Sequence, residues 1–328
     1  MSGTVIVTGA AGGLGLALAE SIVNRPEAEA CIFTVRNQSA ANAKPLHTLR
    51  ESTQGKTVEI HELDLSKADA VRTFAAAINT KVSNKQLPPI RALILNAAAI
   101  PMMGPRQLIN WNDAGDLEMM FAVNHVANFL LTLLLLPSLD PEHGRIVLVS
   151  SDAHRMEKLE WNLEEISRGE QVPGAGDKWN DVMRRYGMSK LCQVMFMHEL
   201  QARLDADPRL NKICVLAVSP GAMIHPNIMN KMNPFMKYVV GPVASGVFKA
   251  VSRVNPDGVM RTVEKSAAHV RRAAFDVEDP ELGRYPKDLY LDGAKIVKPL
   301  EESFDKAKQK ELWDFSVKLA GLTGQSIL

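Results

Sequence analysis

Two residues four positions apart, Tyr186 and Lys190, have side chains that can move a proton together. They lie in the segment YGMSK, inside a stretch from 179 to 204 whose pattern predicts a helix, so this spacing puts them on one helix face. A free tyrosine has a pKa of about 10 and is a poor acid or base at neutral pH. A nearby ammonium stabilises the phenolate and lowers that pKa, so the pair can exchange a proton with a carbonyl oxygen. The same spacing also describes an ordinary surface pair, and only the surrounding residues distinguish the two.

Further polar residues are expected at the ends of strands. Ser150 and Ser151 end one apolar run, and Asn96 ends another. Ligands bind at the carboxyl ends of the strands in open α/β sheets, and a hydroxyl there can hydrogen-bond a substrate oxygen. Asn124 lies inside an otherwise apolar helical stretch, where a buried amide needs partners. It is either a satisfied core amide or a residue that holds a water beside Lys190.

A glycine-rich turn predicts a phosphate site. The segment from Thr8 to Gly15 reads TGAAGGLG and joins a β-branched run to a helical one. Glycine is favoured here because a Cβ would obstruct both the sharp turn and the approach of a pyrophosphate to the backbone. The helix that begins near Leu14 offers unpaired N–H groups and a positive dipole end. The residues at the core of this motif are Gly9, Gly13 and Gly15, and a turn without a ligand is the alternative.

Arg36 indicates which dinucleotide binds. It lies 21 residues after Gly15, at the expected end of the second strand. An acidic residue that binds the ribose hydroxyls of NAD would stand about 20 residues on, but the local sequence TVRN has no carboxylate. A guanidinium can hold a 2′-phosphate through two hydrogen bonds. We therefore expect NADPH in preference to NADH, with a solvated surface arginine as the alternative.

The elements that must position these residues alternate between strand and helix. Because the strands are continuously apolar, the pattern predicts a parallel sheet with helices on both faces, a Rossmann-type doubly wound α/β fold. We expect a single domain over 1–328, with a core at 1–222 and a substrate lid, last strand and tail at 223–328. The predicted strands are 4–8, 31–35, 57–63, 92–95, 145–150, 212–218 and 290–297, and the predicted helices are 14–23, 67–81, 113–136 and 179–204.

In this order, the motifs resemble those of a classical short-chain dehydrogenase/reductase. The resemblance spans residues 4 to about 222, and by it a catalytic tetrad consists of Asn124, Ser151, Tyr186 and Lys190. It implies that Tyr186 is the general acid in reduction, that Ser151 orients the carbonyl, that Lys190 tunes Tyr186 and holds the nicotinamide ribose, and that Asn124 supports a proton-relay water. The residues that it places at the cofactor are Thr8, Gly9, Gly13, Leu14, Gly15, Arg36, Asp64, Leu65, Asn96, Tyr186, Lys190, Pro220 and Gly221.

Within this family, the chain is similar to the retinol dehydrogenase and protochlorophyllide reductase-like branch and to fungal reductases of secondary metabolism. Ala98 stands where the family usually has glycine, and His225 stands where it often has threonine. The link from Ser151 to Tyr186 is long, and we expect its insert, 152–178, to form part of the substrate entrance. The Met-rich segment 223–260 is predicted to be an apolar lid, or alternatively a packed or intersubunit segment.

The net charge and the cysteine count limit the classes of partner and of metal or disulfide site that we expect. A net charge of +1 argues against nucleic acid as the main partner, and Cys31, Cys192 and Cys214 are too few and too scattered for a disulfide scaffold or a cysteine-based zinc site. No metal site is predicted. The N-terminus lacks a signal-peptide pattern, and the longest apolar run is shorter than the roughly 20 residues of a membrane span. We expect a cytoplasmic protein, with the 113–136 helix available for pairing with a second copy.

The predicted function is NADPH-dependent reduction of a ketone or aldehyde, or the reverse alcohol oxidation, on an apolar small molecule. Two alternatives remain open. One is a non-redox enzyme on the same scaffold, such as a cyclase, isomerase or dehydratase, because fold does not dictate function. The other is a regulatory protein that senses NADP(H) without catalysis, although such a protein has no need of both Tyr186 and Lys190.

Overall fold

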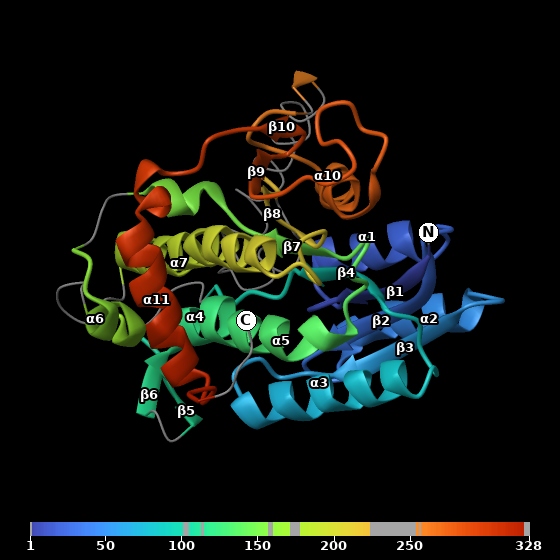
Figure 1. Ribbon diagram of the computed structural model, residues 1–328, viewed down its shortest axis with the longest axis horizontal. Coiled ribbons are helices and arrows are strands. Elements are labelled where there is room, and N and C mark those ends of the chain that lie inside the picture. Colours follow the sequence, from blue (N-terminus) through green and yellow to red (C-terminus); the bar gives the residue numbers. More distant parts are fainter. Residues whose placement is uncertain are drawn as a thin grey trace, which may run out of the picture.

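The structure is a computed structural model that describes residues 2–100, 105–112, 115–156, 160–170, 178–223, 254–255 and 257–324. Its centre is an eight-stranded sheet in the order β10-β9-β8-β7-β4-β1-β2-β3, parallel except for β10 (Figure 1). The chain order reverses between β1 and β4, as the predicted doubly wound sheet requires. The strands are β1 (Gly3–Val7), β2 (Ala28–Val35), β3 (Thr57–Glu62), β4 (Ile90–Leu95), β7 (Arg145–Val149), β8 (Cys214–Ser219), β9 (Leu289–Asp292) and β10 (Lys295–Ile296).

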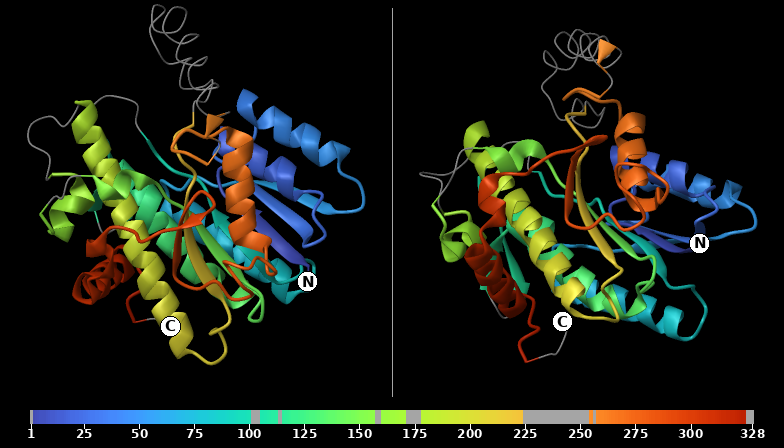
Figure 2. Two further views of the ribbon diagram at one scale, coloured as in Figure 1. Left: turned by 90° about the horizontal axis from the view of Figure 1, so that it is seen from above. Right: turned by 45° about the horizontal axis from the view of Figure 1, so that its top comes forward.

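Helices cover both faces of the sheet (Figure 2). One face carries α1 (Gly13–Ile22), α2 (Lys44–Ser52) and α10 (Val263–Phe275). The other carries α3 (Ala68–Ser83), α5 (Ala127–Leu135) and α7 (Trp179–Ala206), and α11 (Lys306–Leu319) packs against α7. Shorter pieces complete the described chain: β5 (Leu108–Asn112), β6 (Gly115–Glu118), α4 (Met119–Phe121), α6 (Leu163–Arg168), and short helices at Ala41–Ala43, Ala122–Val126, Leu136–Ser138, Asp152–Arg155 and Glu301–Phe304.

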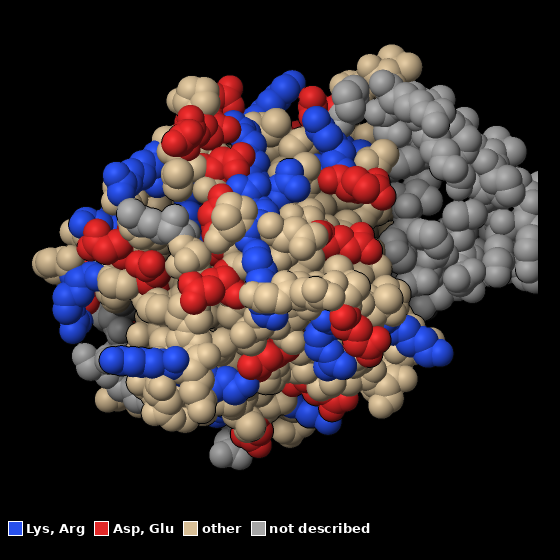
Figure 3. Space-filling model, turned by 90° about the vertical axis from the view of Figure 1, so that its right-hand side faces the viewer, with Lys and Arg blue, Asp and Glu red and all other residues tan. Residues whose placement is uncertain are grey.

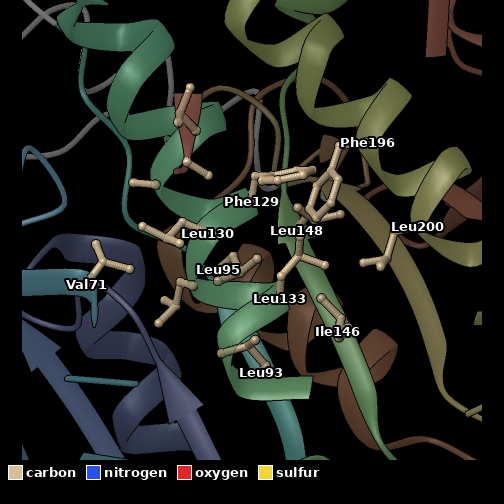
Figure 4. Packing of buried hydrophobic residues seen from close by; sticks show 14 of the residues in the cluster. Val71, Leu93, Leu95, Phe129, Leu130, Leu133, Ile146, Leu148, Phe196 and Leu200 are labelled. Atoms are coloured by element: carbon tan, nitrogen blue, oxygen red, sulfur yellow. The ribbon is translucent and has the colours of Figure 1, made fainter. Parts of the chain in front are cut away.

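Two apolar cores hold the layers together, one on each side of the sheet. Successive side chains of a strand point to opposite faces, so each central strand contributes to both cores, which explains its unbroken apolar sequence. In the core shown in Figure 4, Leu95 of β4 and Leu148 of β7 meet Phe129 of α5 and Phe196 of α7. The sheet and both helical layers confirm the predicted fold class.

The prediction of one helix over 113–136 is wrong at its start. Residues 115–118 form β6, which pairs antiparallel with β5, and the helix begins at Met119. Glu118 fixes that beginning, because its carboxylate accepts hydrogen bonds from the backbone N–H groups of Met120 (2.8 Å) and Phe121 (3.0 Å). Residues 113 and 114 lie outside the described part.

The last predicted strand, 290–297, is two strands. β9 pairs parallel with β8, and β10 returns antiparallel beside β9. Gly293 makes the reversal with a φ of +59°, a conformation that glycine adopts easily. The sequence DGAK around Gly293 was the signal for this hairpin. The same C-terminal third supplies α10 and α11, so it is built into the sheet and both layers.

The stretch Met119–Ser138 is long and apolar enough to cross a membrane by composition, and 89% of its best window is buried inside the structure. It is a core helix, as the sequence predicted. Pairing of two copies through this helix stays a prediction, and the nearly complete burial leaves little of its surface for such a contact.

The described residues carry surface charges of mixed sign and buried thiols. On the face shown in Figure 3, acidic and basic side chains are interspersed rather than gathered by sign. The cysteines are free and buried. The described parts of the insert, 152–156 and 160–170, pack onto the body. Whether the insert borders a substrate entrance stays a prediction. His225 and most of the predicted lid lie outside the described residues.

The packing of α11 makes a prediction about stability. Trp313 is 5% exposed, packs edge-on against Phe129 at 5.0 Å between ring centroids, and lies under the guanidinium of Arg203. Trp313→Ala should lower the free energy of unfolding by about 3–5 kcal/mol, measured by denaturant titration. Trp179→Ala is the matched control, because Trp179 is 51% exposed, and it should change stability little. Equal losses in the two variants would contradict this packing.

Candidate active site

The glycine turn between β1 and α1 is closed so tightly that it excludes side chains. Gly9 has a φ of +66°, and a Cβ there would lie 2.9 Å from Ala97. A Cβ on Gly15 would lie 2.2 Å from the Gly9 carbonyl oxygen. No side chain caps the beginning of α1, and its first turn has no acidic residue. The turn therefore presents backbone N–H groups and a positive helix end to a ligand.

Asn96 and Thr8 tie this turn to the end of β4. The Asn96 amide donates to the carbonyl oxygens of Thr8 (2.8 Å) and Gly9 (3.2 Å), and the Thr8 hydroxyl accepts from the Ala97 N–H (3.0 Å). These hydrogen bonds fix the distance between the ends of β1 and β4. A ligand that lies along this edge of the sheet has to span that distance. Asn96 thus has a positioning role in addition to its place on the cavity wall.

A cavity of about 560 Å³ runs along this carboxyl edge of the sheet. It starts at the glycine turn, passes the ends of β2, β3 and β4, and reaches Tyr186 and Lys190 on α7. Its size is that of a site for a small molecule or cofactor. Among the residues that the structure describes, the charged ones that line it are Arg36, Asp64 and Lys190.

Arg36 is exposed at the end of β2, on the cavity wall. The neighbouring Asn42, on the short helix Ala41–Ala43, lines the same end. Glu62 is aligned with Val35 in the β2–β3 register, and its carboxylate accepts a hydrogen bond from the Gln38 N–H (2.9 Å). The Glu62 carboxylate is therefore engaged with the backbone, and Arg36 lines the cavity at the end of β2.

Tyr186, Ser151 and Lys190 come together where β7 ends against α7. Tyr186 is 7% exposed, and the Ser151 side chain lies close enough to its hydroxyl to lower the pKa of Tyr186. Ser150 lines the cavity, and the contact with Tyr186 supports Ser151 as the hydroxyl that acts with it. The Lys190 ammonium lies 5.7 Å from the centre of the Tyr186 ring and donates to the Val149 carbonyl oxygen (2.8 Å). The side chains on one helix face thus reach the end of a central strand, as their spacing predicted.

Burial shifts the proton affinity of both α7 residues. Burial raises the pKa of Tyr186 to about 12, against a lowering by the Ser151 hydrogen bond. Burial lowers the pKa of Lys190 to about 7, because the ammonium is nearly withdrawn from water. Tyr186 is thus held as the protonated acid at neutral pH, and Lys190 titrates in the physiological range.

Asn124 lies in a π turn behind the cavity wall. Across this turn, the Ala127 N–H donates to the Ala122 carbonyl oxygen, five residues back. The Asn124 amide accepts from the Ala99 N–H (2.8 Å) and donates to the Ser189 hydroxyl (3.0 Å). The amide is satisfied by the core, which is the first of the two alternatives, and the water beside Lys190 stays a prediction. The same contacts join the loop after β4 to the helix that carries Tyr186.

Hydrogen bonds and ring contacts around His154 hold the backbone of Ser151 in place. The His154 Nε2 accepts from the Leu300 N–H (3.1 Å), so its Nδ1 carries the proton and donates to the Ser151 carbonyl oxygen (2.7 Å). Tyr290 packs against the His154 ring at 4.8 Å between centroids, and Asp152 accepts from the Ser219 hydroxyl (3.1 Å). Burial lowers the pKa of His154, so the ring is held neutral.

The structure gathers most of the predicted site residues around one cavity. Ser151, Asn124 and Thr8 stand behind its wall, and Gly221 instead packs against Arg261. The sequence reasoning missed Asn42, Ser66 and Gln193, of which Gln193 is detectable as the residue one helical turn after Lys190. The predicted residues on the wall are Gly9, Gly13, Leu14, Gly15, Arg36, Asp64, Leu65, Asn96, Tyr186, Lys190 and Pro220.

Comparisons with known proteins agree with this geometry. A model of the short chain dehydrogenase family matches residues 3–163. The chain is 35% identical to the short-chain dehydrogenase iccH of Talaromyces variabilis, over 99% of this chain and 98% of that protein. It is 28% identical to the short chain dehydrogenase macD of Penicillium terrestre, over 97% of this chain and 91% of that one. An NADPH-bound carbonyl reductase from chicken fatty liver shares the fold, with a TM-score of 0.58 at 16% identity over 90% of this chain and 98% of that chain.

The chain therefore belongs to the short-chain dehydrogenase family and is a NAD(P)-dependent oxidoreductase. The predicted family and its similarity to fungal reductases are confirmed. The site fits the cofactor class, because the turn leaves room where side chains would collide and the start of α1 is uncapped. The residues that would hold the dinucleotide are the turn from Gly9 to Gly15, the ends of β2, β3 and β4, and Lys190.

The glycine turn makes the next prediction. Gly15→Ala should weaken binding of the reduced nicotinamide dinucleotide at least tenfold, about 1.4 kcal/mol, because the new Cβ forces the turn open. Fluorescence titration of the reduced nicotinamide measures this loss. Gly12→Ala is the control for the turn itself, since a Cβ there has 3.5 Å to the Gly9 carbonyl oxygen and should leave the melting temperature unchanged. Wild-type affinity in Gly15→Ala would refute the assignment.

Proposed function

We propose that this protein reduces a ketone or aldehyde on an apolar small molecule with NADPH, or catalyses the reverse alcohol oxidation. One observation carries the proposal. Tyr186, close to Ser151 and next to Lys190, lies on the wall of the same cavity as the glycine turn. A proton donor and a dinucleotide site thus share one space, as carbonyl reduction requires.

The roles of the protein's own residues follow from their contacts. Ser151 and Tyr186 hydrogen-bond the carbonyl oxygen and hold it in place, and Tyr186 transfers its proton to that oxygen. The Lys190 ammonium stabilises the phenolate that remains on Tyr186. A bound reduced nicotinamide supplies the hydride that the carbonyl carbon accepts. In alcohol oxidation the proton moves in the opposite direction, to a Tyr186 phenolate.

NADPH is the proposed cofactor because Arg36 is the cation at the end of the cavity near β2. A 2′-phosphate there would gain charge-assisted hydrogen bonds, whereas the hydroxyls of NADH offer no negative charge to the guanidinium. The NADPH named in the chicken carbonyl reductase structure supports the same choice.

We propose an apolar substrate because the cavity that Tyr186 lines also carries aliphatic and thioether side chains, among them Ile100, Met119, Val123 and Met223. Methionine suits surfaces that adapt to several ligand shapes. A fungal secondary metabolite is the substrate class we favour, from the similarity to the two fungal dehydrogenases. The free, buried cysteines support the cytoplasm as its location.

Removal of the proton donor tests the mechanism. Tyr186→Phe should lower kcat about 100-fold or more while the Kd for NADPH stays within about twofold, because only the hydroxyl is lost. NADPH oxidation with a panel of aromatic, steroid, retinoid and polyketide-like ketones measures turnover. Tyr285→Phe, on an exposed tyrosine, should match the wild type. Unchanged turnover in Tyr186→Phe refutes the mechanism, and product formation without NADPH oxidation indicates a non-redox reaction.

The cofactor assignment has its own test. Arg36→Ala should weaken NADPH binding about 10–100-fold and leave NADH binding unchanged, because only NADPH carries the phosphate that the guanidinium contacts. Isothermal titration with each cofactor measures both constants. Arg50→Ala replaces an exposed arginine on α2 and should change neither binding constant. A wild-type preference for NADH, or equal losses for both cofactors, would exclude Arg36 from the phosphate site.

A further inference from the structure

A buried glutamine forms the second contact of the Lys190 ammonium. Gln193 is 1% exposed and lies one helical turn after Lys190 on α7. Its side-chain oxygen accepts from the Lys190 ammonium at 3.2 Å, while the Val149 carbonyl oxygen accepts at 2.8 Å. Since Lys190 is 1% exposed, these two oxygens replace most of the hydration that the ammonium would have in water.

The other end of the same amide contacts the π turn. Its nitrogen donates to the Asn124 carbonyl oxygen at 3.4 Å, and Asn128 donates to that oxygen at 2.9 Å. Gln193 thus spans from Lys190 to the backbone of Asn124. The Asn124 carbonyl oxygen thus accepts from two side-chain amides.

Apart from the Val149 and Gln193 oxygens, few polar or charged groups act on the Lys190 ammonium. Tyr186 is the titratable group that shares its face of α7, and burial is the cause of the lowered Lys190 pKa. Several titratable side chains on α7 and on the elements packed against it have partners elsewhere or are neutral thiols: His125 contacts Ser316, Asp152 contacts Ser219, His154 contacts the Ser151 carbonyl, Glu118 contacts Arg185, Glu302 contacts Lys308, Glu311 contacts Trp161, and Cys192 and Cys214 are buried. Arg155 contacts Asp152, Lys306 contacts Gln309, Lys310 contacts Asp314, and Glu301 contacts Lys298.

We propose that Gln193 is a positioning residue that keeps Lys190 charged and directed toward Tyr186, by acting as a fixed link between the ammonium and the π turn. The amide oxygen stabilises the ammonium over the neutral amine, and the contact with the Asn124 carbonyl holds that oxygen in place. The role in catalysis rests on the proposed carbonyl reduction, whereas the effect on Lys190 itself does not.

The pH dependence of reduction tests the link. Reduction needs the ammonium, so kcat should be full below the Lys190 pKa and fall as the pH rises through it, giving a limb near pH 7. Gln193→Leu removes the acceptor and should move this limb about one unit lower. Gln193→Glu puts a carboxylate beside the ammonium and should move it about one unit higher. Each profile is recorded with saturating NADPH.

A matched variant separates this role from a structural one. Gln201 is also buried on α7, 2% exposed, and bonds the Ile213 carbonyl oxygen and the Val215 N–H, far along the helix from Lys190. Gln201→Leu should cost stability as Gln193→Leu does, and it should leave the pH limb in place. Equal limb shifts in the two variants would overturn the proposal.

A direct titration of Lys190 distinguishes the failure of the link from the failure of the proposed function. The full-length protein is labelled with lysine carrying ¹³C at Cε, and the Lys190 resonance is assigned with Lys190→Arg. The Lys190 pKa should fall in Gln193→Leu and rise in Gln193→Glu. These shifts without any carbonyl reduction would support the link and refute the function. An unmoved Lys190 pKa in both variants would overturn the link, whatever the activity.

Discussion

Keeping a lysine ammonium inside an apolar core is the constraint around which this site is arranged. Lys190 needs acceptors, and the end of β7 supplies one through the Val149 carbonyl while α7 supplies another through Gln193. These contacts require the strand end and the helix to lie at one fixed distance. The same packing brings Tyr186 close to Ser151 and leaves Tyr186 on the cavity wall. The reactive geometry is therefore a by-product of satisfying one buried charge.

Much of this arrangement was readable from the sequence because it depends on local pattern and topology. The glycine turn, the strand ends at Asn96 and Ser151, and the spacing of Tyr186 and Lys190 are each short-range signals, and the parallel sheet forces them to one edge. The prediction that failed, a helix from residue 113, followed the helical pattern and overlooked a local signal, the capping carboxylate of Glu118. The helix expected from 113 begins at Met119, since the Glu118 carboxylate caps it there and the preceding residues pair as a hairpin.

Contacts between residues far apart in the chain could not be predicted in this way. The support of Ser151 by His154 depends on the Leu300 N–H, and the packing of α5 depends on Trp313. No periodicity connects such residues, because they meet only when the C-terminal third folds back over the core. Gln193 is an intermediate case: its distance from Lys190 is local, but its bond to the Asn124 carbonyl depends on the packing of two helices.

The contact between the π turn and α11 has a consequence for how the protein matures. His125, next to Asn124, hydrogen-bonds Ser316 at 2.7 Å, and 191 residues separate them in the chain. During synthesis the partner of this buried imidazole leaves the ribosome long after the turn itself. The nascent Rossmann core can pair its strands early, but the segment that carries Asn124 is fully enclosed only once α11 docks. Formation of the site is thereby tied to the docking of a helix made much later than the turn.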